Sequence, residues 1–177
     1  MKKTTLALIV GGLLCANYAS AASSNTISFQ GEVSDETCSV SVNGNDASPV
    51  VLLPTVSASD LATSGATAGQ TTFEMGVSGC TGDATAATTI STVFVGNNVS
   101  SAGNLTNTGT ASNVEVQLLD TTDEPIVLTG GYTASGDLTL AAGETSSSAT
   151  YTAQYYATGA ATSGTVAASL QYAVSYQ

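Results

Sequence analysis

Gly164-Thr165-Val166-Ala167-Ala168-Ser169-Leu170-Gln171-Tyr172-Ala173-Val174-Ser175-Tyr176-Gln177 closes the chain, and this stretch decides the fold. After the glycine, apolar residues occupy every second position and small or polar residues occupy the positions between them. Side chains of a β-strand point alternately to its two faces, so this period of two predicts a strand of twelve residues, about 40 Å long, with one apolar face. The strand is either a long core strand that ends the domain or an edge strand that pairs with another chain.

The rest of the chain is also typical of strands. Short segments rich in Val, Ile, Thr and Phe alternate with turn residues such as Asn43-Gly44 and Gly130-Gly131, and only residues 57–68 suggest a helical turn. Many short strands separated by turns predict one all-β domain, a sandwich or a barrel. The expected strands are residues 38–42, 50–53, 72–77, 90–95, 114–118 and 126–128, with Val33 in a further one.

The composition excludes several classes of function. The 177 residues include 13 Asp and Glu but no His or Trp, and the two basic residues are Lys2 and Lys3. Without them the chain has no side chain that could serve as the base or amine of a Ser–His, Cys–His or Schiff-base enzyme. It also lacks the cations that neutralise nucleic-acid phosphates. We therefore expect no enzyme, no cofactor, no metal site and no nucleic-acid partner.

The N-terminus has the features of a signal peptide. Lys2 and Lys3 precede an apolar run over residues 6–15, and Ala19-Ser20-Ala21 fits a signal-peptidase site. The run is too short to span a bilayer, which takes ~20 apolar residues. We expect residues 1–21 to be removed during export, and no later segment to insert into a membrane.

Two cysteines, Cys38 and Cys80, remain after this cleavage. In an oxidising compartment they most simply form a disulfide. The alternative is a reactive thiol or a metal-binding pair, and no histidine accompanies the cysteines to build one.

The segment that follows the signal peptide has a second alternating pattern. Ile27, Phe29, Gly31 and Val33 fall on one face of an extended chain. These residues fit an ordinary first strand equally well.

Several motifs together resemble the type 1 fimbrial (pilin) subunits of the chaperone–usher pathway. They are Phe29-Gln30-Gly31-Glu32-Val33, Thr37-Cys38-Ser39-Val40, a second cysteine at Cys80, Tyr151-Thr152-Ala153-Gln154-Tyr155-Tyr156-Ala157, Gly164 at the fourteenth position from the end, and the penultimate Tyr176. The resemblance covers essentially all of the chain after the signal peptide.

The resemblance implies an incomplete immunoglobulin-like β-sandwich that lacks its last strand. A periplasmic chaperone would fill the vacant groove first, and the N-terminal extension of the next subunit would then replace it at the outer-membrane usher. Residues 22–33 would be the donor strand, with Ile27, Phe29, Gly31 and Val33 as its inserted residues, and residues 34–177 the pilin domain. The acceptor strand would comprise Gly164, Val166, Ala168, Leu170, Tyr172, Val174 and Tyr176.

The function expected from the resemblance is that of a structural subunit. It would be exported through the periplasm and polymerise by donor-strand exchange into a surface fimbrium used in cell adhesion. The alternative is a minor tip or adaptor pilin, or a secreted receptor- or carbohydrate-binding β-sandwich, although three Phe and no Trp are few aromatic residues for a sugar site. A cluster of three carboxylates in residues 120–124 could hold calcium, but it lacks the glycine and the spacing of a loop site, so we interpret it as a solvated turn.

Overall fold

Nine strands and one 3₁₀ turn form the part of the chain that the computed structural model describes, residues 38–176. Among these residues, no helix is long and apolar enough to cross a membrane. In chain order the elements are β1 (Ser39–Val42), η1 (Ala58–Leu61), β2 (Thr67–Ser78), β3 (Thr88–Gly96), β4 (Leu105–Thr106), β5 (Val114–Leu119), β6 (Tyr132–Thr133), β7 (Leu138–Leu140), β8 (Ser146–Ala157) and β9 (Leu170–Tyr176).

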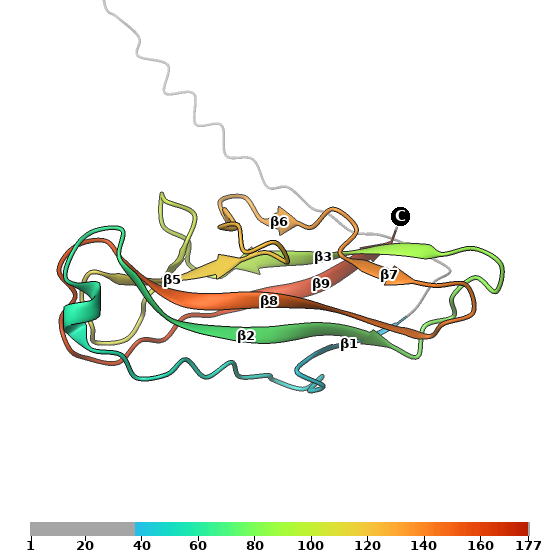
Figure 1. The fold of residues 1–177 in the computed structure, drawn as a ribbon, viewed down its shortest axis with the longest axis horizontal. Coiled ribbons are helices and arrows are strands. Elements are labelled where there is room, and N and C mark those ends of the chain that lie inside the picture. The colour runs from blue at the N-terminus through green and yellow to red at the C-terminus, as the bar shows by residue number, and fades with distance from the viewer. Residues whose placement is uncertain (1–37, 177) are drawn as a thin grey trace, which may run out of the picture. The chain divides into compact units, whose positions relative to one another are not determined.

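The strands make two antiparallel sheets, as the sequence predicted for an all-β fold (Figure 1). One sheet has the order β1-β2-β8-β5-β4. In the other, β3 is central: β6 and β7 pair along one of its edges, and β9 pairs along the opposite edge from Ile90–Tyr176 to Gly96–Leu170. Each sheet therefore ends in a strand, β1 or β9, that pairs with one neighbour among the described residues.

The core lies between the two sheets and follows from the alternation of side chains. In β2, Phe73, Met75 and Val77 are buried, whereas the residues between them face the other side of the sheet. The Phe73 ring lies 5.9 Å from that of Tyr151 on β8, and Phe94 of β3 meets Tyr151 edge-on at 5.0 Å. These aromatic contacts join the two sheets at the centre of the core.

Cys38 and Cys80 form a disulfide that fixes the start of β1 to the end of β2. The bond closes a loop of 42 residues. In the chain-entropy account, a loop of this length stabilises the fold by about 4 kcal/mol.

Several strand boundaries differ from the sequence predictions. Residues 50–53 and 126–128 are extended but belong to no strand, because no described segment pairs with them along their length. In residues 57–68, the expected helical turn is limited to η1, which Ser57 caps, and β2 begins at Thr67. The strands β4, β6 and β7 were not predicted because they are too short to show an alternating pattern in the sequence. The first half of β8 was not predicted because it is rich in serine and has no apolar alternation.

The carboxylate cluster of residues 120–124 is a turn. Asp120 accepts hydrogen bonds at Oδ1 from the Thr122 and Glu124 backbone N–H groups, at 2.8 and 3.0 Å. Within the described part of the chain, no group of three His, Cys, Asp or Glu residues is arranged to hold a metal ion.

Candidate functional site: an apolar groove between two sheet edges

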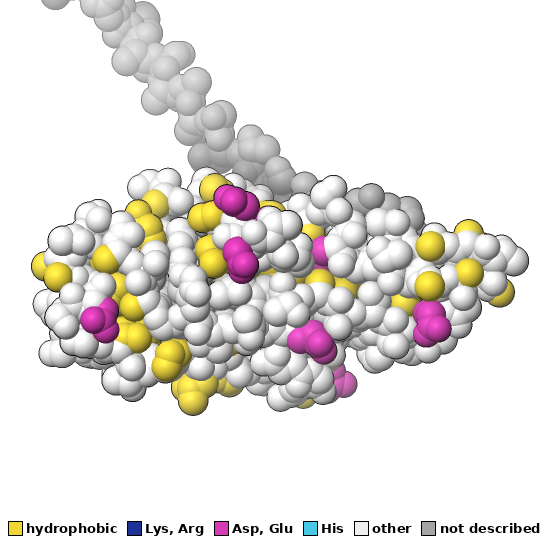
Figure 2. All heavy atoms as spheres, viewed as in Figure 1, with side chains coloured by type: hydrophobic (Ala, Val, Ile, Leu, Met, Phe, Trp, Pro, Cys, Tyr) yellow, Lys and Arg dark blue, Asp and Glu magenta, His cyan; other side chains and the backbone are white. Residues whose placement is uncertain are grey.

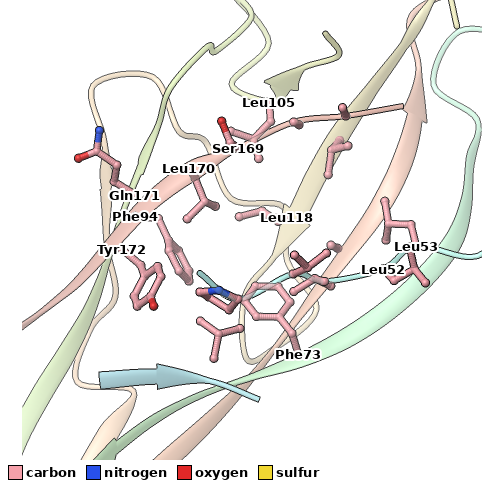
Figure 3. A pocket seen from close by; sticks show the side chains of 18 of the residues that line it. Leu52, Leu53, Phe73, Phe94, Leu105, Leu118, Ser169, Leu170, Gln171 and Tyr172 are labelled. Carbon is pink, nitrogen blue, oxygen red and sulfur yellow. The ribbon is translucent and has the colours of Figure 1, made fainter. Parts of the chain in front are cut away.

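A groove of about 840 Å³ opens between the two sheets (Figure 3). We call it the edge groove. Figure 3 shows Leu170 and Phe94 on one side of it and Leu52 and Leu53 on the other. Its lining residues are Val42, Ser48, Pro49, Val50, Val51, Leu52, Leu53, Phe73, Met75, Phe94, Leu105, Val116, Leu118, Ala153, Tyr155, Val166, Ala167, Ala168, Ser169, Leu170, Gln171 and Tyr172.

The floor of the edge groove is the hydrophobic core itself. Both sheets contribute to it, with Phe73, Leu118 and Ala153 from one and Phe94 from the other. These four side chains are no more than 6% exposed. The groove therefore reaches down to core side chains and is not a depression on the outer face of a sheet.

One rim of the groove is the C-terminal segment. Val166, Ala168, Leu170 and Tyr172 line the groove, and Val174 and Tyr176 continue the same face along the core. All six side chains are only partly buried although they contact the main core cluster. β9 pairs with β3, and no other strand among residues 38–176 pairs with its second edge. From Leu170 to Val174 the rim thus combines half-buried apolar side chains with a strand edge that has no second strand beside it among the described residues.

The first half of this rim is held by a close crossing rather than by β3. The strand that we predicted from residue 165 begins only at Leu170, because residues 165–169 lie beyond the end of β3 and cross residues 107–111. The Thr108 and Ala111 N–H groups donate to the carbonyls of Ala167 and Thr165, at 2.8 and 3.0 Å. Asn107 adds a bond, because its Oδ1 accepts from the Ala167 N–H at 2.9 Å.

Two glycines make this crossing possible. A Cβ on Gly164 would lie 2.7 Å from the carbonyl carbon of Thr110 and 2.8 Å from Cα of Ala111. A Cβ on Gly109 would lie 2.6 Å from the carbonyl carbon of Thr165. Side chains at either position would push the two backbones apart and displace the rim of the groove.

The opposite rim is the extended segment of residues 48–53. Val51 and Leu53 are partly buried against the core, whereas Val50 and Leu52 are 80% and 84% exposed. Beyond the segment, the Tyr155 hydroxyl donates to the Pro54 carbonyl at 3.1 Å and fixes the chain to β8. Sequence reasoning predicted a strand here, but it did not assign the segment to the site.

The edge strands of the two sheets are joined at one end of the domain. The Tyr176 hydroxyl accepts a hydrogen bond from the Cys38 backbone N–H at 3.0 Å, which joins the last residue of β9 to the residue before β1. Because Cys38 is also held by the disulfide, the sheet edges have a fixed separation at this point.

The electrostatics of the groove are those of an apolar binding surface. None of its lining residues is charged. Burial raises the pKa of Tyr155, so this phenol stays neutral. The pKa of Tyr151, beneath the groove, is raised mainly by desolvation, and its hydroxyl donates to Asp137 at 2.7 Å. An uncharged cleft beside an open strand edge suits an extended apolar peptide that can add a strand.

The structure describes the predicted acceptor residues but not the predicted donor residues. Val166, Ala168, Leu170 and Tyr172 line the edge groove, Val174 and Tyr176 extend its rim, and Gly164 lies at the crossing. The predicted donor residues Ile27, Phe29, Gly31 and Val33 lie outside the described residues. Sequence reasoning missed two contributors, residues 48–53 and 107–111, because neither carries a pattern that relates it to the C-terminal strand.

The fold and the groove define a class of protein, a β-sandwich with an apolar groove between the edges of its two sheets. Comparison with known proteins agrees with this class. The family model described as fimbrial protein matches residues 27–177. The chain is 39% identical to the F17 fimbrial protein of Escherichia coli, over 94% of this chain and 96% of that one. It is 36% identical to the major fimbrial subunit SMF-1 of Stenotrophomonas maltophilia, over 93% and 99% of the two chains.

Solved structures show the same fold. The P pilus rod subunit PapA aligns with a TM-score of 0.60 over 79% of this chain and 99% of its own, at 16% identity. The chain belongs to the fimbrial protein family. As a member of that family it is a structural pilin, and it polymerises with other pilin subunits into a surface fimbrium.

Proposed function

We propose that the subunits join by donor-strand exchange, in which residues 22–33 of one copy enter the edge groove of the next. The observation that carries this proposal is the position of the β9 edge, which from Leu170 to Val174 pairs with no second strand among the described residues, directly beside an apolar groove that reaches the core. An inserted strand would pair with this edge, and its alternate side chains would enter the groove. Ile27, Phe29 and Val33 supply the large side chains, and Gly31 suits a position without room for one.

The energy of such a joint is comparable to the stability of a domain. Burying three large apolar side chains contributes about 1.5–3 kcal/mol each. Each ladder hydrogen bond adds a net ~0.5–1.5 kcal/mol. Every copy donates one strand and accepts another, so the contact is heterologous and does not close on itself. The product of repeated exchange is a fibre.

The route to the fibre follows from the same groove. Before assembly, the groove would leave core side chains and a strand edge open to aggregation. A periplasmic chaperone would cover them after export directed by residues 1–21, and the outer-membrane usher would exchange the chaperone for the next subunit. The family resemblance implies that the chaperone holds its client with basic residues. A client with 13 acidic side chains and no basic residue after Lys3 suits such a partner.

Thermal unfolding of two oxidised forms of the subunit tests the proposal. One form consists of residues 34–177, and the other carries residues 22–33 after Gln177 on a short flexible linker. If the strand completes the fold, several kcal/mol should raise the melting temperature by more than ~10 °C, at ~2–4 °C per kcal/mol for a domain of this size.

A matched control carries the same twelve residues in scrambled order, which keeps composition and length but breaks the alternation. Its melting temperature should equal that of residues 34–177 alone. If all three forms melt together, cooperatively and as monomers, the sandwich is already complete and donor-strand exchange is refuted.

A further inference from the structure

The carboxylates on the surface of the described domain have no basic side chain to pair with. Residues 38–176 contain ten Asp and Glu residues and no Lys, Arg or His. Seven of the ten are exposed, and they are Asp46, Asp60, Glu74, Asp83, Asp123, Glu124 and Glu144. In Figure 2, the Asp and Glu side chains are spread from one end of the visible face to the other, and no Lys, Arg or His appears among the described side chains. Their negative charges therefore add, since no ion pair within residues 38–176 neutralises them.

Hydrogen bonds favour the charged form of two of the ten carboxylates, Asp83 and Asp120. Asp83 accepts at Oδ1 from the hydroxyl and the N–H group of Thr85, at 2.7 and 2.6 Å, which lowers its pKa. At Asp120, desolvation raises the pKa, but the hydrogen bonds from Thr122 and Glu124 outweigh it, so that the pKa is lowered. All of these donors are uncharged, so they hold the negative charge in place without cancelling it.

Polymerisation repeats this charge along a line. Glu32, Asp35 and Glu36 bring the acidic residues of each copy to 13, and no residue after Lys3 is basic. β2 and β8 have 12 residues each, which is about 40 Å at 3.3 Å per residue. Subunits of this length added end to end carry about one negative charge per 3–4 Å. This spacing is well within the ~8 Å Debye length of 0.15 M salt, and duplex DNA has one charge per ~1.7 Å. A fibre of these subunits is therefore a polyanion.

We propose that the fimbrium binds linear peptides rich in Lys and Arg along its surface, through many equivalent carboxylates rather than in one pocket. Such a partner supplies the cations that the chain lacks, and it releases the small counterions that a dense line of charge collects. A diffuse mode of binding fits the spread of the carboxylates, because among residues 38–176 no group of three His, Cys, Asp or Glu is arranged to hold a metal ion. The proposal rests on polymerisation and does not depend on how the subunits are joined.

Fluorescence anisotropy of a labelled peptide of about ten lysines, titrated with intact fibres, tests the proposal. The peptide should bind, and its affinity should fall at least about tenfold between 50 and 200 mM salt, because each ion pair formed releases counterions. A peptide of the same length made of alternating Gly and Ser should not bind. Absence of lysine-peptide binding at about 50 mM salt, or an affinity equal at both salt concentrations, would overturn the proposal.

Two pairs of charge-removing substitutions distinguish a diffuse surface from a pocket. Asp46 and Glu74 line a polar hollow of about 500 Å³ whose other lining residues are uncharged, whereas Glu124 and Glu144 are exposed in loops outside it. Asp46→Asn with Glu74→Gln, and Glu124→Gln with Glu144→Gln, keep the size of each side chain.

Fibres of either double variant should bind the lysine peptide at least about twofold more weakly than the wild type at low salt, because both pairs contribute to the same field. The fibre with all four substitutions should lose affinity by the product of the two factors, as independent sites do. If only the variant at Asp46 and Glu74 loses binding, the hollow is a discrete site and the diffuse mode is wrong. Unchanged affinity in both variants would equally overturn the proposal.

Discussion

Replacing Gly164 with alanine should destabilise the subunit, because the added methyl group would overlap backbone atoms. A Cβ at this position would lie 2.7 Å from the Thr110 carbonyl carbon and 2.8 Å from Cα of Ala111, and it would also overlap the Ala111 nitrogen. Overpacking a tight site costs about 1–3 kcal/mol. The lower entropy of the unfolded alanine chain offsets ~0.4–1 kcal/mol of this. The expected net loss is about 1–2 kcal/mol.

Thermal unfolding of the oxidised subunit measures this loss. At ~2–4 °C per kcal/mol, the melting temperature should fall by about 2–8 °C. Gly109→Ala should behave in the same way, because its Cβ would meet the carbonyl carbon of Thr165 from the other side of the crossing. Both variants should also accept a peptide of residues 22–33 more weakly, since the crossing positions the rim of the edge groove.

Gly159→Ala is the matched control. Its backbone also lies outside the left-handed region, and its Cβ would make only an ordinary contact of 3.5 Å with Asn113. Its melting temperature should be unchanged or rise by a few degrees, through the unfolded-chain effect alone. The steric reasoning is refuted if Gly164→Ala melts at or above the temperature of Gly159→Ala.

Four further predictions follow from the composition and the core. Tyr151→Phe removes the hydroxyl that donates to Asp137 and should cost about 1–2 kcal/mol in urea unfolding. Burial raises the folded pKa of Tyr151 above its ordinary value of 10.0, so the stability that this group contributes is complete below about pH 10 and is lost as the pH rises further. Between about pH 10 and pH 11.5, the stability of the Tyr151→Phe variant should therefore fall less steeply than that of the wild type. Reduction of the Cys38–Cys80 disulfide should cost about 2–5 kcal/mol, and equal urea midpoints with and without reductant would contradict this. The unfolded mature chain should resist trypsin, since Lys2 and Lys3, the only basic residues of the sequence, lie in the segment expected to be removed, and any tryptic fragment would show that a cleavable residue is retained. Finally, fibres should be looser at 5 mM than at 300 mM salt, because carboxylate repulsion is screened over ~10 Å at 0.1 M; equal diameter and stiffness at both salt concentrations would contradict this.

The parts of the fold that the sequence predicted are those in which one strand carries a long alternating pattern. Residues 72–77 and 90–95 lie within β2 and β3, because burial on one face of a sheet requires an apolar residue at every second position. The prediction failed for residues 50–53. Their composition is that of a strand, but whether an extended segment becomes one depends on a partner for its backbone, which the segment itself does not encode.

In the candidate site, too, the alternating pattern predicted which face is apolar but not which segment lies beside the strand. The apolar positions from Val166 to Tyr176 were assigned correctly to one face, since alternation specifies a face without reference to any partner. The strand itself is shorter than predicted, because β3 ends at Gly96 and residues 107–111 replace it as the neighbour of residues 165–169.

The sequence by itself determined the class of this protein. Alternation predicted an all-β domain, and the motifs near both ends of the chain indicated the pilin family. Only the tertiary structure decided where the site lies. The edge groove exists because the two sheets end in β1 and β9 on the same side of the core, and its rims come from residues more than a hundred positions apart. Local patterns fix which face of a strand is apolar, but long-range pairing fixes which strands become neighbours in a sheet.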